Sequence, residues 1–164
     1  MLNFRRNLIF FRPYHWVLEG LSVLLALAAL VAAIAGRSSM PEQVPTHWDF
    51  HGNPNGWGSP NSFLLFPIIM LLVILTTSLI IHSLDISQWN MPFKLNPARQ
   101  LPVGRAFITT LLFVNLELGA FTLWFTLQTI RQDMTGTAAF ITMFVVVLML
   151  TLAIGTALSY LRNK

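Results

Sequence analysis

Four long apolar stretches constrain this chain more than any other feature of its sequence. They run over about residues 14–35, 62–81, 104–130 and 137–160, and only the first and third contain an acidic residue. A helix needs about 20 apolar residues to cross a hydrocarbon core of about 30 Å. The sequence therefore predicts an all-α, polytopic membrane protein, a four-helix transmembrane bundle in a single domain of residues 1–164.

The composition supports a chain that is surrounded by lipid. Only 10% of the residues are charged and 55% are hydrophobic, whereas an ordinary soluble domain is about 25% charged. The chain has no Cys, which excludes disulfides and thiolate metal sites. Its net charge of +4 does not indicate nucleic-acid binding, because the basic residues flank the apolar stretches instead of forming one patch.

The basic residues predict the orientation of the helices. Eight of the ten Lys and Arg lie in the N-terminal arm, the connection between the second and third stretches and the C-terminal tail; the others are Arg37 and Arg131. Because Lys and Arg accumulate on the cytoplasmic side, we expect both termini and a loop of about residues 82–103 in the cytoplasm. Residues 36–61 then form a structured extracytoplasmic loop. A cleaved signal peptide is the alternative for the first stretch, although its apolar run exceeds the usual 7–15 residues.

Small residues recur every four positions on two of the stretches, as with Ala29 and Ala33 or Ala153 and Ala157. This spacing lets helix backbones approach closely in lipid, where the hydrophobic effect does not drive packing. The contacts could join helices of one chain or of two copies. The pattern therefore leaves a homo-oligomer open.

The predicted outer loop contains the most distinctive polar run, which reads PTHWDFHGNPNGWGS over residues 45–59. In an extended segment, His47, Asp49 and His51 share one face. Two imidazoles and a carboxylate suit zinc or another divalent metal, and no other cofactor is expected. The alternatives are that His47 and Asp49 form the scaffold of a Gly- and Asn-rich turn, or that they contact a peptide.

The run from Val44 to Ser59 resembles the signature of a family of bacterial membrane proteins of unknown function. The domain of that family also forms the N-terminal part of SdpI-like immunity proteins, which protect cells from a secreted killing peptide and relay its presence. The resemblance implies a location in the bacterial cytoplasmic (inner) membrane. The residues of the signature that it implies as loop scaffold or ligand contacts are His47, Trp48, Asp49, Gly52 and Trp57. A segment of residues 89–99 is similar to a second, cytoplasmic motif of the family, through Asn90, Pro92 and Arg99.

Polar side chains inside the predicted spans form a second group of candidates, namely His15, Glu19, His82, Asn115 and Glu117. Glu117 lies about twelve residues from Arg105, or roughly 18 Å along a helix, which is near the bilayer midplane. A charge there costs at least about 2.5 kcal/mol, so Glu117 is expected to be protonated or paired. A relay from His82 or His15 through Glu19 to Glu117 would form a proton path. The alternative is that these side chains only bond neighbouring helices.

Three functions agree with these patterns. The preferred one is a non-enzymatic binding or immunity-like sensor module in the lipid bilayer, whose outer loop receives a peptide or other envelope ligand and whose segment of residues 90–105 signals to a membrane partner protein. The first alternative is a small proton-coupled transporter or channel subunit centred on Glu117. The second is a metal-dependent envelope enzyme that uses His47, Asp49 and His51. An enzyme is not favoured and no catalytic residue is assigned, because H-E-x-x-H, G-x-S-x-G and phosphate-binding Gly-rich loops are absent.

Overall fold

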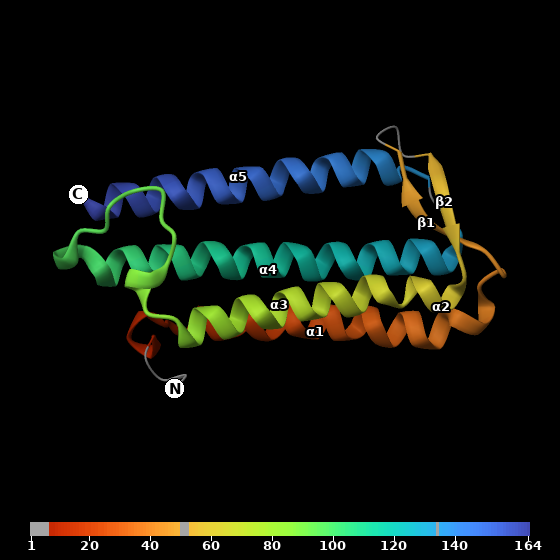
Figure 1. Cartoon of the computed structure of the whole chain (residues 1–164), viewed down its shortest axis with the longest axis horizontal. Coiled ribbons are helices and arrows are strands. Elements are labelled where there is room, and N and C mark those ends of the chain that lie inside the picture. Colours follow the sequence, from red (N-terminus) through yellow and green to blue (C-terminus); the bar gives the residue numbers. More distant parts are fainter. Residues whose placement is uncertain (1–6, 50–52, 134) are drawn as a thin grey trace.

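The computed structural model describes residues 7–49, 53–133 and 135–164 as long helices with a small β-hairpin at one end (Figure 1). The long helices are α1 (Pro13–Gly36), α3 (Leu65–Ser83), α4 (Gln100–Arg131) and α5 (Thr137–Asn163). Within the described ranges, four helical segments are long and apolar enough to cross a membrane. The predicted all-α polytopic bundle is thereby confirmed.

Helix α4 lies at the centre and contacts α1, α3 and α5. A Cβ atom added at Gly119 of α4 would lie 2.8 Å from the carbonyl oxygen of Ser22 on α1, so these two helices need a glycine at their contact. Ala29 and Ala33 are fully buried, whereas Ala153 on α5 is exposed. The small residues of α1 thus support close packing within the chain.

The hairpin consists of β1 (Val44–Trp48) and β2 (Pro54–Gly58), which pair antiparallel. The register shifts on both sides of His47, where β1 is irregular. Such a bulge interrupts the strict alternation of side chains between the two faces of a strand. The short helix α2 (Pro60–Phe63) follows, and its N-cap Ser59 accepts a hydrogen bond from the backbone N–H of Ser62 at 3.3 Å.

The two ends of the bundle carry different charges. Lys164 and the first described turn, η1 (Leu8–Phe10), lie at the end opposite the hairpin (Figure 1). The described charged residues of that end are Arg12, Glu19, Asp85, Lys94, Arg99, Arg105, Arg162 and Lys164. Those of the hairpin end are Arg37, Glu42, Asp49, Arg131 and Asp133. Positive charge is therefore concentrated at the end that holds η1 and Lys164.

The turn from α4 to α5 depends on two residues with positive φ, Gln132 at 56° and Gly136 at 75°. A side-chain oxygen of Asp133 accepts the backbone N–H of Thr135 at 3.0 Å. This hydrogen bond favours the carboxylate form and lowers the pKa of Asp133 below its ordinary value. The turn is therefore held by local hydrogen bonds at the hairpin end.

Candidate functional site

His47 and Asp49 each bond an Asn of the hairpin. The Nδ1 atom of His47 is paired with the side-chain oxygen of Asn55 on β2. Asp49 follows β1 and accepts the backbone N–H of Asn53 at 2.8 Å, so its carboxylate closes the loop between the strands. These are the contacts that the scaffold interpretation of the two residues requires.

The predicted metal set of His47, Asp49 and His51 depends in part on residues 50–52, which the structure does not describe. His51 and Gly52 lie outside the described residues. Among the residues that are described, no group of three His, Asp or Glu side chains is arranged to hold a metal ion. The metal site stays a prediction, which the metal content of the purified protein can test.

A hollow of about 510 Å³ lies beneath the hairpin. His47, Trp48 and Asp49 line it from β1 and the loop that follows. Its remaining wall is mostly aromatic and comes from α2, α3 and α4: Phe63, Phe66, Phe121 and Phe125. Leu65 and Ile69 of α3 also line it and remain more than half exposed, so the hollow opens toward the side of the bundle that a bilayer would surround.

Trp48 is the side chain that joins the hairpin to this aromatic wall. Its ring meets Phe125 edge-on, with ring centroids 4.9 Å apart. Its indole Nε1 is buried and has no hydrogen-bond partner among the described residues. An indole N–H can only donate, and a buried donor without an acceptor costs about 1–3 kcal/mol. Trp57, by contrast, is 58% exposed, as expected of an aromatic ring at a membrane interface.

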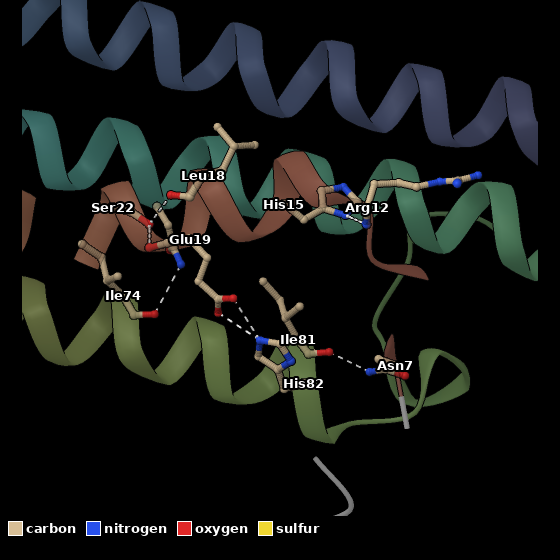
Figure 2. A network of polar contacts seen from close by, with 10 residues as sticks. Asn7, Arg12, His15, Leu18, Glu19, Ser22, Ile74, Ile81 and His82 are labelled. Carbon is tan, nitrogen blue, oxygen red and sulfur yellow. Dashed lines mark hydrogen bonds and ion pairs between the residues drawn. The ribbon is translucent and has the colours of Figure 1, made fainter. Parts of the chain in front are cut away.

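Glu19 and His82 form an ion-pair geometry between α1 and α3 (Figure 2). The Nε2 atom of His82 lies 3.0 Å from both carboxylate oxygens. Phe11 and Trp16 stack on the imidazole at centroid distances of 4.6 and 5.5 Å. The pair is thus shielded by aromatic rings and joins the N-terminal segment to the end of α3.

His15 bonds α4 instead of α3. Its Nδ1 accepts the backbone N–H of Arg12 at 3.0 Å, so that nitrogen carries no proton (Figure 2). Its Nε2 lies 2.8 Å from the hydroxyl of Thr109, and that hydroxyl donates to the carbonyl of Arg105 at 2.7 Å. These contacts define a neutral imidazole that donates from Nε2.

Glu117 points to α5, where the hydroxyl of Thr151 donates to one carboxyl oxygen at 2.5 Å. The other oxygen is buried and has no partner among the described residues. Asn115, two positions earlier, is fully buried and donates to the carbonyl of Ile74 on α3 at 3.3 Å. The two side chains therefore serve different helix contacts.

The structure does not bring the proposed relay together. Glu19 bonds His82 on α3, whereas Glu117 bonds Thr151 on α5. In the part of the chain that is described, no hydrogen bond joins Glu19 or His15 to Glu117. The continuous path from His82 or His15 to Glu117 is thus not formed by direct contacts, because α4 presents Glu117 on its α5 side.

The predicted second motif, residues 89–99, covers the connection from η3 (Ile86–Gln88) to η4 (Pro97–Arg99) and η4 itself. Asn90, Pro92 and Arg99 are all exposed there. The contact that holds this connection comes from Asn96, whose backbone N–H donates to the side chain of Asn163 at 2.8 Å. Asn163 in turn donates to the carbonyl of Lys94 at 3.0 Å, so the C-terminal end of α5 fastens the connection.

Several polar residues of the structure were not among the candidates from sequence. Asn7 is 2% exposed and its amide donates to the carbonyl of Ile81 at 2.7 Å (Figure 2). It also donates to the carbonyl of Leu84 at 2.6 Å, so Asn7 caps α3. Thr151 and Asn163 were not predicted as site residues either. Asn96 precedes Pro97, which is a usual signal for a helix start, but the partners of Asn7, Thr151 and Asn163 are distant in sequence and leave no local pattern.

Comparison with known proteins finds one similarity. The chain is similar over residues 24–71 to a family described as "Domain of unknown function (DUF1648)". This range includes the run from Val44 to Ser59, much of α1 and the start of α3, and it supports a resemblance to a domain family of unknown function. No curated protein and no solved structure matches the chain.

Proposed function

We propose that this protein is a non-enzymatic membrane binding module whose ligand occupies the hollow beneath the hairpin. The observation that carries the proposal is the buried indole N–H of Trp48, which lines that hollow and has no acceptor among the described residues. A ligand with a carbonyl or other hydrogen-bond acceptor would satisfy this donor. Such a ligand would be amphipathic, because the helices contribute a mostly aromatic and aliphatic wall whereas His47 and Asp49 line the hairpin side.

A short hydrophobic peptide of the cell envelope fits this description. Its side chains would pack against Phe66 and Phe121, and one of its backbone carbonyls would accept from Trp48. The resemblance of the hairpin run to SdpI-like immunity proteins extends the proposal to protection against a secreted killing peptide. The connection around Asn90 and Arg99 would then pass the bound state to a membrane partner protein.

The charges of the two ends support the orientation that this function needs. With the basic end in the cytoplasm, as the positive-inside rule favours, the hairpin faces the outside of a bacterial inner membrane and both termini lie inside. A peptide that approaches from outside would then meet the hairpin and its hollow first.

The proposal can be tested by survival of a sensitive bacterial strain that produces this protein and is challenged with the killing peptide that SdpI-like proteins neutralise. Wild-type protein should raise survival, and Trp48→Phe, which removes only the N–H donor and part of the ring, should abolish the gain. Trp16→Phe, the same change at the opposite end, is the matched control. Absence of protection by wild-type protein that is present at normal levels would overturn the immunity role.

Binding itself is measured separately. Titration of wild-type protein in lipid nanodiscs into a fluorescently labelled form of the same peptide should raise the fluorescence anisotropy of the peptide, and the rise should be lost with Trp48→Phe. Binding without protection would support the role as a binding module and overturn the role in immunity. A peptide that binds Trp48→Phe as tightly as wild type would overturn the proposed site.

A second candidate function rests on Glu117. We infer from its buried, unpartnered oxygen that this carboxyl could bind a proton or a small cation as part of a transport cycle. The absence of a direct chain of contacts to Glu19 makes this candidate the weaker one. In proteoliposomes, a transporter should show pH-dependent flux that Glu117→Gln abolishes while Trp48→Phe leaves it intact.

A further inference from the structure

A second hollow lies in the half of the bundle away from the hairpin, between α4 and α5 and against the start of α1. Its volume is about 350 Å³. Phe113, Ile154 and Leu158 supply apolar wall, and Arg162 lies among the lining residues near the C-terminal end of α5. The hollow therefore combines an apolar groove between two helices with one cationic side chain.

Most of the polar lining lies on the same side as Arg162. Tyr14 and Thr109 line the hollow and their hydroxyl oxygens are 3.2 Å apart. Thr110 lines it as well and donates to the carbonyl of Ala106 in its own helix. The groove thus passes from these hydroxyl groups at the basic end to mainly aliphatic and aromatic side chains farther along α4 and α5, where Thr151 adds one more hydroxyl.

Arg162 has no anionic partner in the described part of the chain, where the recorded ion pair joins Glu19 and His82. Its guanidinium is exposed. The surrounding end of the bundle carries six described Lys and Arg, and its described acids are Asp85 and Glu19, of which Glu19 pairs with His82. A negatively charged group at Arg162 would therefore be attracted by the surrounding positive charge, and few carboxylates of the chain would compete with it for the guanidinium.

We propose that this hollow binds an anionic phospholipid, with its phosphate on Arg162 and one acyl chain in the groove between α4 and α5. A guanidinium pairs with phosphate through two parallel hydrogen bonds. Anionic lipids are enriched in the cytoplasmic leaflet, and the positive-inside rule places this end of the bundle there. The groove follows α4 from Ala106 to Phe113, or about 10 Å at 1.5 Å per residue, enough for the first part of an acyl chain.

This site is independent of the proposed ligand site, because none of its lining residues belongs to the hollow beneath the hairpin. Its role is to hold α5 against α4 through a bound lipid. Among the described elements, α4 is the one long helix with which α5 makes extensive contact. A lipid in the seam would add a second connection between α5 and the start of α1 at Tyr14.

The test uses the full chain in detergent, with dioleoyl-phosphatidylglycerol and dioleoyl-phosphatidylcholine added in equal amounts and retained lipid counted by native mass spectrometry. One Lys or Arg near anionic lipid corresponds to a preference of about fivefold. Wild-type protein should therefore retain about five times as much phosphatidylglycerol as phosphatidylcholine. Arg162→Gln should remove the preference. Arg99→Gln, which removes an exposed charge at the same end without touching the groove, should leave the preference unchanged.

A second pair of variants tests the groove itself. Ile154→Trp adds bulk inside the hollow and should reduce retention of both lipids, whereas Val146→Trp adds the same bulk on an exposed part of α5 outside it. Helical circular dichroism confirms that each variant is folded. Equal retention of the two lipids by wild type, equal losses in Arg162→Gln and Arg99→Gln, or full retention in Ile154→Trp would each overturn the proposal.

Discussion

The imidazole of His82 on α3 faces the carboxylate of Glu19 on α1, and its Nε2 lies 3.0 Å from each carboxylate oxygen. Their side chains are 15% and 14% exposed. The rings of Phe11 and Trp16 stack on His82 and are themselves 5.0 Å apart, so both rings cover the same side of the imidazole. This arrangement couples the N-terminal segment, α1 and α3 at one place.

The Glu19–His82 pair should show strong energetic coupling. We expect Glu19→Ala and His82→Ala each to lower the free energy of unfolding, and the double variant to lower it by about 1–2 kcal/mol less than the sum, because either single change leaves a shielded partner unpaired. Unfolding of the detergent-solubilised protein, followed by circular dichroism during titration with a denaturing detergent, measures all three. Strict additivity would show that the pair contributes no coupling.

Trp48→Phe should separate stability from function. Removal of a buried donor that lacks an acceptor should leave the free energy of unfolding unchanged or raise it by up to about 1 kcal/mol, while peptide binding is lost. The control is Phe125→Leu, which removes the edge contact with Trp48 and should destabilise the hairpin end by about 1–2 kcal/mol. A large loss of stability in Trp48→Phe would mean that the indole N–H has a partner in the free protein.

Glu117→Gln distinguishes the two candidate functions. An amide oxygen can still accept from Thr151, so we expect the variant to fold and, for a binding module, to protect as well as wild type. Thr151→Val should destabilise more, because it leaves both Glu117 oxygens without a donor. Survival and unfolding are measured on the same preparations. Loss of function in Glu117→Gln with unchanged stability would favour the transporter.

The predicted metal site is tested by metal content of the purified protein, with wild type beside His47→Ala, Asp49→Ala and His51→Ala. For the scaffold role we expect no metal above background. Asp49→Ala should then lower stability by about 1 kcal/mol, because the backbone N–H of Asn53 loses its acceptor. Near-stoichiometric zinc that disappears in all three variants would instead support the metal-dependent alternative.

Two glycines of the helical region should respond oppositely to alanine. Gly136 has a φ of 75°, which strains any residue with a Cβ, so Gly136→Ala should lower the free energy of unfolding by about 1 kcal/mol. Gly20 lies inside α1, and an added Cβ would meet no atom within 4 Å beyond its chain neighbours and the adjacent helix backbone, so Gly20→Ala should raise the free energy of unfolding by about 0.5–1 kcal/mol. Thermal melting in detergent compares them. Equal effects would contradict the φ at Gly136.

The site residues show where sequence patterns stop being informative. His15 and Glu19 are four residues apart, a spacing that places two side chains on the same face of a helix. In the structure His15 bonds Thr109 on α4 and Glu19 bonds His82 on α3, because α1 packs against both helices and its inner face is wide enough to serve each. Which neighbour a side chain meets cannot be read from its spacing along one helix.

The sequence by itself determined the number of long helices, their type and the charge difference between the two ends of the bundle. The reason is that the length of an apolar run and the absence of charges within it follow directly from the thickness of a bilayer. Only the tertiary structure decided that Glu117 meets Thr151, that Trp48 closes an aromatic hollow and that Asn7 caps α3. These contacts join residues far apart in sequence, and they depend on how the helices rotate and pack, which apolar surfaces facing lipid do not encode.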